Sequence, residues 1–588
     1  MISRHDFRYF LRPMALCALL VVAACAQPSA TPVSVESARS ALAAGNAADA
    51  RVVLERLLVE GGDRSHLAAL LGEAALASGD EDAAAQWLVD AEFSPDTRAL
   101  GFRMLGRLET LRGNLRAAGK AFDVSHSENP ESADLWVDIG RLRYLGGEHF
   151  QAIDAADRAM ALDPASAAAL QFRGQLVRDY QGTEAGAAWF ARAVEENPSN
   201  TDLRLEYAAT LADGGRARES LDALRAAGGR ARTTSRGHYI RAVIAARGRN
   251  FALSRELLQR SGLVREDVPS ALLLSAVIDL EEGNFASAAQ TLDRLHTRQP
   301  DNARVVDLFA LALSRSGSER ELIQRFDLRA RDATGSAYLR TLVGRAHETL
   351  GNRAEAASLL DLAAAARSTL AVLPGTTPSD ALSTRTGERD LQARDIVRYA
   401  IGRGRIGLAY LQASAFATRN PGSADAWSLL GDAEYARGNK MAARAAYFRS
   451  ARVRQPWPLT LRIASTQNDP VAAQELLESY VRGHPANGQA AAMLADAYAA
   501  QGRWSDAANL LDHAMRSGMA RVPWVLASRS VAAGKLGDAD AALEYALAAH
   551  ELQPMNPPAI AALIAALPDE ERPARAELSA KLASLPGT

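Results

Sequence analysis

Between residues 99 and 200, one pattern of apolar, small and polar positions passes three times without an insertion. In the middle copy, apolar residues follow one another at three-residue steps, at Trp136, Ile139, Leu142 and Leu145. This spacing predicts a first helix with one buried stripe. A second run, which begins near Glu148, places apolar or small residues on a facing stripe, at Ile153, Ala156, Ala159 and Met160. The pattern therefore predicts a helix–turn–helix unit that recurs at a constant period.

Glycine, proline and capping residues mark the same period. Gly140 lies beside the first stripe, where its small size would let the second helix approach closely. Between the two helices, glycines recur once per period at Gly45, Gly79, Gly113 and Gly147, and we expect them in the left-handed conformation that ends a helix. Proline, which stops a helix, is followed two positions later by a residue that caps the next one. This happens at Pro130/Ser132, Pro164/Ser166, Pro198/Asn200, Pro300/Asn302, Pro421/Ser423, Pro485/Asn487 and Pro554/Asn556.

The repeated unit resembles the tetratricopeptide repeat (TPR). The pattern of that family is W-x2-L-G-x2-Y, then A-x3-F, then P, and its period is the one found in this chain. The middle copy matches it at Trp136, Ile139, Gly140, Ala152, Ala159 and Pro164, and both neighbouring copies also fit. The resemblance implies an all-α superhelical solenoid, in which length counts repeats rather than separate globular cores.

The copies extend over most of the chain of 588 residues. An N-terminal array is legible over residues 36–368 and a C-terminal array over residues 390–555, together about 15 to 16 repeats. The period fails at 369–389, a Pro-, Gly- and Thr-rich segment that predicts a loop or linker, either functional or a plain surface insertion. Residues 556–588 predict a polar closing pair of capping helices.

The N-terminus predicts an export signal. Residues 1–24 combine three arginines with an apolar stretch, and Val22-Ala23-Ala24-Cys25 resembles the lipobox of bacterial lipoproteins. That resemblance implies cleavage before Cys25, which would carry the lipid, followed by a tether over residues 25–35. The alternative is an uncleaved membrane anchor, but eleven apolar residues span only about half of the hydrocarbon layer. Cys17 is the other cysteine, so the mature chain would form no disulfide.

Composition and motifs favour binding over catalysis. A net charge of −2 gives no indication of nucleic-acid binding. The string Gly402-x-Gly404-x-x-Gly407 matches a dinucleotide fingerprint, but helical patterns flank it where a strand is required. The ten histidines have no metal-ligand spacing, and nucleophile and P-loop motifs are missing. We therefore expect no enzyme activity, no cofactor and no metal site.

The TPR resemblance implies a ligand groove along the first helices, at repeat positions 2, 5, 9, 12 and 13. Carried onto the regular copies, these positions give the candidate contacts Arg103, Arg107, Arg141, Tyr144, Gln171, Gln175 and Arg178, with Asp134 and Asp179 beside them. Beyond the linker they include Arg394, Arg398, Asp425, Asp432 and Tyr435. Arginine binds carboxylates bidentately, so an acidic peptide or an anionic polysaccharide would suit the first group. A solvated helix face is the plainer interpretation.

The expected function is that of a non-catalytic, lipid-anchored TPR scaffold for protein–protein interactions in a Gram-negative envelope, on the outer membrane and facing the periplasm. The chain is similar to TPR lipoproteins of pilus assembly, secretion or polysaccharide export. The alternative is a glycan- or small-ligand-binding periplasmic protein that uses the arginine-lined groove.

Overall fold

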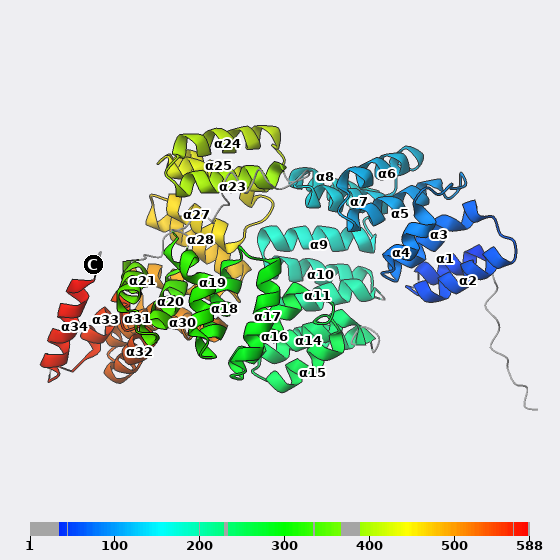
Figure 1. Cartoon of the computed structure of the whole chain (residues 1–588). Coiled ribbons are helices and arrows are strands. Elements are labelled where there is room, and N and C mark those ends of the chain that lie inside the picture. Colours follow the sequence, from blue (N-terminus) through cyan, green and yellow to red (C-terminus); the bar gives the residue numbers. More distant parts are fainter. Residues whose placement is uncertain are drawn as a thin grey trace, which may run out of the picture. The chain divides into compact units, whose positions relative to one another are not determined.

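The computed structural model describes residues 34–43, 45–198, 200–228, 233–332, 335–365, 389–568 and 570–585. Over these residues it contains 32 α-helices, one π-helical turn and no strand. The helices form sixteen consecutive pairs (Figure 1). The all-α repeat fold predicted from the sequence is thus confirmed.

By its internal contacts the chain divides into two compact units, one ending at Pro130 and one beginning at Glu131. The first unit contains three helix pairs: α1 Val35–Ala43 with α2 Ala47–Val59, α3 Arg64–Ala77 with α4 Glu81–Leu88, and α5 Arg98–Leu111 with α6 Leu115–Glu128. The division falls elsewhere than the predicted arrays, whose bounds come from the repeat period and stay predictions.

The second unit begins with seven pairs. They are α7 Ala133–Leu145 and α8 His149–Leu162, α9 Ala167–Gln181 and α10 Thr183–Glu196, α11 Thr201–Asp213 and α12 Ala217–Ala226, α14 Ser235–Arg247 and α15 Phe251–Ser261, α16 Pro269–Glu281 and α17 Phe285–Arg298, α18 Ala303–Arg315 and α19 Glu319–Arg331, and α20 Ala337–Thr349 and α21 Arg353–Ala365. The predicted linker lies outside the described residues, apart from Arg389, which begins the next helix.

Six further pairs complete the second unit. They are α23 Arg389–Gly402 and α24 Ile406–Arg419, α25 Ala424–Ala436 and α26 Lys440–Ala451, α27 Trp457–Thr466 and α28 Pro470–Gly483, α29 Gly488–Ala500 and α30 Trp504–Ala514 with its π-turn Met515–Met519, α31 Pro523–Lys535 and α32 Ala539–Leu552, and α33 Pro557–Ala566 and α34 Arg572–Ser584. The closing pair was predicted to be polar, and only α34 is: α33 buries Ile560, and it packs Leu563 against residues of the preceding pair.

The predicted helix caps are all present. Each of the seven Ser or Asn residues that follow a proline by two positions accepts a hydrogen bond from a backbone N–H of the next helix, at 2.9 to 3.4 Å. The four glycines between paired helices have φ angles of 74° to 80°, the left-handed conformation expected of them. Local sequence therefore fixes where these helices begin and end.

The repeat glycine of the first helix, Gly106 or Gly140, lies where a neighbouring helix comes close. A Cβ on Gly106 would overlap the Phe122 ring of the second helix. At the position equivalent to Phe122, the next copy has Ala156, and Phe172 of the following pair fills the space beside Gly140 instead. The predicted buried stripe on α7 was wrong: the helix buries Leu135, Val137 and Asp138, whereas Trp136, Ile139 and Leu142 are only partly buried and Leu145 is 63% exposed. The helix turns this last residue away from its neighbours.

Within the second unit, α23–α34 contact α8–α10 directly. The backbone N–H of Phe150 donates to the Gly422 carbonyl at 3.1 Å, and that of Gln455 donates to the Asp179 carbonyl at 3.0 Å. The Thr183 hydroxyl donates to the Gly483 carbonyl at 3.1 Å. These contacts join turns of helix pairs that lie far apart in sequence, on opposite sides of the predicted linker.

Candidate ligand-binding groove

The predicted groove residues belong to three first helices in two units. Arg103 and Arg107 lie on α5 in the first unit, Arg141 and Tyr144 on α7 in the second, and Gln171, Gln175 and Arg178 on α9. Each group is described within its own unit, so a groove that joins them stays a prediction.

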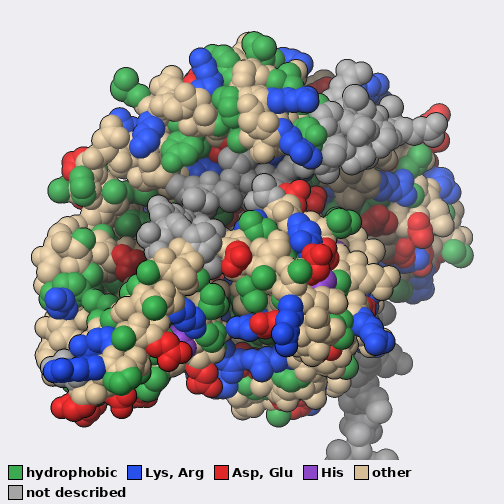
Figure 2. Space-filling model, turned by 60° about the vertical axis from the view of Figure 1, so that its left-hand side comes forward, with side chains coloured by type: hydrophobic (Ala, Val, Ile, Leu, Met, Phe, Trp, Pro, Cys, Tyr) green, Lys and Arg blue, Asp and Glu red, His purple; other side chains and the backbone are tan. Residues whose placement is uncertain are grey.

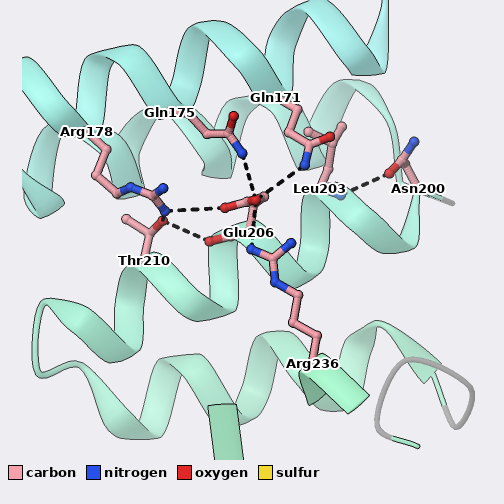
Figure 3. Close-up of polar contacts among 8 residues, drawn as sticks. All are labelled: Gln171, Gln175, Arg178, Asn200, Leu203, Glu206, Thr210 and Arg236. Atoms are coloured by element: carbon pink, nitrogen blue, oxygen red, sulfur yellow. Dashed lines mark hydrogen bonds and ion pairs between the residues drawn. The ribbon is translucent and has the colours of Figure 1, made fainter. Parts of the chain in front are cut away.

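The α9 residues converge on one carboxylate, that of Glu206 on α11 (Figure 3). Gln175 Nε2 donates to Oε1 of Glu206 at 2.9 Å, and Gln171 Nε2 donates to the same oxygen at 3.3 Å. The Arg178 guanidinium lies 3.3 Å from Oε2 of Glu206 and also donates to the Thr210 hydroxyl at 3.1 Å. Arg236, at the start of α14, approaches Oε1 at 2.7 Å. Three successive helix pairs therefore meet at a single side chain.

Glu206 is buried but ionised. Its side chain is 3% exposed, so burial opposes the charge, but Arg236, Arg178 and Gln175 together outweigh burial and hold its pKa below the ordinary value. The chain itself thus supplies the carboxylate that these donors were predicted to bind. A ligand carboxylate at this position would have to compete with Glu206.

The sequence offered a signal for this cluster that the groove positions did not capture. Glu206 occupies position 6 of its copy, which is not a groove position; Arg236 occupies position 2, which is one, but it lies where the repeat pattern is blurred. Glu206 follows Gln171 by one repeat length plus one residue. Because equivalent positions in stacked repeats are neighbours, a carboxylate one repeat after an amide or an arginine is a candidate partner.

Tyr144 also has a partner within the chain. Its hydroxyl donates to Oδ2 of Asp179 at 2.8 Å, and its ring meets the edge of the His149 ring at a centroid distance of 5.1 Å. Burial, followed by the charge of Asp179, raises the pKa of Tyr144. The Arg141 guanidinium lies 5.9 Å from the centroid of the Phe172 ring. Tyr144 also lies near the ion pair of Asp425, on α25, with Arg454, which follows α26.

Asp432 was predicted to line the groove beyond the linker, and that interpretation is wrong. Its carboxylate is 2% exposed, accepts from the Tyr447 hydroxyl at 2.9 Å and pairs with Arg462 at 3.1 Å. Burial raises its pKa, and the charge of Arg462 opposes that rise. Asp432 is therefore a core group that links α25, α26 and α27.

The dinucleotide-like string forms the turn between two helices. Gly402 ends α23, Gly404 has a φ of 70°, and Gly407 lies in the first turn of α24. Its helical context excludes the strand-based nucleotide site, as expected. Among the described residues, no group of three His, Cys, Asp or Glu side chains is placed to hold a metal ion.

The predicted membrane attachment is not covered by the structure. Residues 1–24, Cys25 and most of the tether lie outside the described part of the chain. Within that part, every helix is too short or too polar to cross a membrane.

Three segments of the chain match models of the tetratricopeptide repeat, namely residues 35–96, 394–458 and 464–519. The chain thus carries tetratricopeptide repeats near its N-terminus and on the far side of the predicted linker. TPR repeats suggest a scaffold for protein–protein interaction. None of the curated proteins compared with the chain matches it.

Several solved structures resemble the fold at low identity. The APC/C hetero-tetramer Cut9–Hcn1 is 14% identical over 93% of this chain and 92% of that chain, with a TM-score of 0.38. The human IFIT1 dimer with PPP-AAAA is 15% identical over 66% and 90%, with a TM-score of 0.35. YrrB, described as a TPR protein with an unusual peptide-binding site, is 18% identical over 31% and 93%, with a TM-score of 0.23. At these scores, none of the three carries an argument about what this chain binds.

Proposed function

We propose that this protein is a lipid-anchored, non-catalytic TPR scaffold that holds protein partners in assembly or export at a Gram-negative cell envelope. Acylated Cys25 would attach it to the outer membrane on the periplasmic side. The observation that carries the scaffold role is the continuity of the repeats: helix pairs follow one another from Val35 to Ser584 wherever the chain is described. The lipobox-like sequence before Cys25 supports the anchor.

The proposed partner surface lies along the first helices. Arg103 and Arg107 are one turn apart on α5, a spacing that suits carboxylates of an acidic protein segment. Arg141 and Tyr144 on α7 are the corresponding candidates in the second unit. The donors Gln171, Gln175 and Arg178 remain candidates only for a ligand that displaces or tolerates Glu206.

The anchor is tested by cell fractionation. Cys25→Ala should move the protein from the membrane fraction to the soluble periplasm, or leave an unprocessed precursor, and should abolish incorporation of a labelled fatty acid. Two or more acyl chains on one cysteine bind a membrane far more firmly than the marginal attachment of a single chain. Unchanged membrane association together with unchanged labelling would refute the anchor.

The scaffold is tested by capture after crosslinking in intact cells. Arg103→Ala with Arg107→Ala should reduce recovery of protein partners at least tenfold, since a desolvated arginine–carboxylate contact contributes about 2 kcal/mol or more. Arg56→Ala is the control, because Arg56 lies on α2, a second helix of the same unit, and forms an exposed pair with Glu60 at the end of that helix. Equal recovery from both variants would refute the arginine surface, and retention of saccharide alone would favour the glycan-binding alternative.

A further inference from the structure

Two neighbouring second helices differ from all the others in their charge. Among the second helices of the pairs in the described chain, only α24 and α26 contain neither Asp nor Glu. They belong to successive pairs, α23/α24 and α25/α26, and begin one repeat length apart, so equivalent positions face the same side of the repeat stack.

The outward stripe of α24 mixes cations with large apolar side chains. Arg405, Leu408, Leu411, Ala415 and Arg419 follow at steps of three or four residues, which places them on one helix face. Leu408 is 40% exposed and Leu411 is 65% exposed. Both are therefore turned out of the core rather than into it.

On α26 the exposed apolar residues lie at other repeat positions than on α24, since Leu408 and Leu411 correspond to Ala442 and the exposed Ala445. Met441 is 74% exposed and Phe448 is 44% exposed, and they lie two turns apart with the exposed Lys440 at the start of the helix. Within the described part of the chain, no carboxylate lies at ion-pair distance from Arg405, Arg419 or Lys440. Among the described residues, these three charges thus have no carboxylate to compensate them.

The carboxylates of α25, which lies between the two stripes, are already engaged. Asp425 pairs with Arg454, Glu434 is nearly buried and pairs with Arg437, and Asp432 lies in the core. Along the upper edge of Figure 2, at the level where Figure 1 places α24 and α25, blue and green side chains dominate over red ones. This face is cationic and apolar at once.

We propose that the face formed by α24 and α26 docks on the surface of an anionic phospholipid bilayer. Exposed Leu, Met and Phe side chains insert at the boundary between headgroups and acyl chains, while Arg and Lys beside them bind lipid phosphates. Charge complementarity selects this occupant, because the cations surround the apolar residues and no acidic residue of either helix would repel the lipid. This contact holds the C-terminal array against the membrane independently of any lipid on Cys25.

The first test places a polarity-sensitive fluorophore on the face. In the full chain with Cys17→Ser and Cys25→Ala, the dye is attached at Leu411→Cys, or at Leu328→Cys as the control. Leu328 is 86% exposed on α19, a second helix that contains three acidic residues. Vesicles of phosphatidylcholine with phosphatidylglycerol should shift emission to the blue at residue 411 only, and pure phosphatidylcholine should shift neither. Cys25→Ala removes any acyl chain, and the label at residue 328 reports binding through residues 1–24 equally, so failure of the anchor hypothesis does not affect the comparison of the two sites.

The second test uses charge-matched variants in vesicle flotation. Leu411→Glu with Met441→Glu should weaken binding to the anionic vesicles at least tenfold, because each charge near an anionic surface changes affinity by about fivefold. Leu328→Glu with Leu547→Glu adds the same charge elsewhere and should stay within about threefold of the parent chain. Equal binding by the two variants, a blue shift at both labelled sites, or binding that does not depend on phosphatidylglycerol would overturn the proposal. If the first variant does not fold, the fluorophore comparison decides alone.

Discussion

Removal of the Glu206 charge provides a sharp check on the physical account of the α9–α11–α14 contact. Glu206→Gln keeps the side-chain size but turns one carboxylate oxygen into a donor, which would face the donors of Gln171, Gln175, Arg178 and Arg236. Deletion of one partner from a fully buried ion pair costs about 3 to 5 kcal/mol. The Arg178 and Arg236 side chains are 25% and 43% exposed, so water can partly replace the lost carboxylate. We therefore expect a loss of roughly 2 kcal/mol.

Amide hydrogen exchange is the appropriate assay because a repeat array opens locally rather than as a whole. A loss of about 2 kcal/mol corresponds to roughly a thirtyfold faster exchange in α9, α11 and the start of α14 at neutral pH. Glu256→Gln is the control, since Glu256 forms an exposed pair with Arg260 four residues on and should change exchange by about threefold at most. No difference between the two variants would show that the cluster does not hold the repeats together.

The same cluster predicts a direction of pH dependence. The pKa of Glu206 is lowered in the folded chain relative to its ordinary value of 4.5. The ionised form therefore stabilises the fold above about pH 4.5, and this contribution is lost as pH falls through the lower folded pKa. The difference in exchange between wild type and Glu206→Gln should accordingly shrink in strong acid. A constant difference down to about pH 3 would refute the assignment of an ionised Glu206.

Three further predictions concern packing and the contact between the arrays. Gly431→Ala should destabilise by about 1 to 3 kcal/mol in thermal melts, because its Cβ would overlap the Tyr447 ring, whereas Gly407→Ala, which meets nothing, should be neutral or stabilising. Burial lowers the folded pKa of His149 below 6.5. Acidification through that pKa should protonate the ring nitrogen that accepts the Ala424 N–H, and amide hydrogen exchange at Ala424 should become faster. His149→Gln should not show that pH step. A protease site inserted at residue 380 should yield two fragments that co-elute, and separation of the native fragments would contradict the inter-array hydrogen bonds.

Charged groups around His149 affect the pH at which its hydrogen bond with Ala424 is lost. The ring packs between Tyr144 on its own pair and the start of α25, with Asp425 favouring the charged form and Arg454 opposing it. A backbone N–H can only donate, so Nδ1 of the neutral ring must be the acceptor at 3.1 Å. The hydrogen bond is thus lost on protonation, whichever way the surrounding charges shift the midpoint.

Sequence alone determined the features that depend on a few consecutive residues. The fold class, the pair as the unit and the seven capped helix starts follow from spacing, because a cap bonds to backbone groups within three residues and a glycine ends a helix locally. The helical surroundings of the string Gly402-x-Gly404-x-x-Gly407 could also be predicted, since they depend on the residues directly before and after it. The predicted stripe of α7 failed, because the helix packs against both α8 and α9 and buries Leu135 and Val137 rather than one stripe of its own period.

Only the tertiary structure decided which charged groups meet. Arg178 was correctly predicted to lie on a first helix, but its partner Glu206 lies on the next helix pair. Local sequence does not predict that Arg236 of α14 reaches the same carboxylate. The contacts of Phe150 with Gly422 and of Thr183 with Gly483 depend on the accumulated twist of many repeats. Small rotations add along a solenoid, so the approach of distant turns is a global property, whereas each helix pair is a local one.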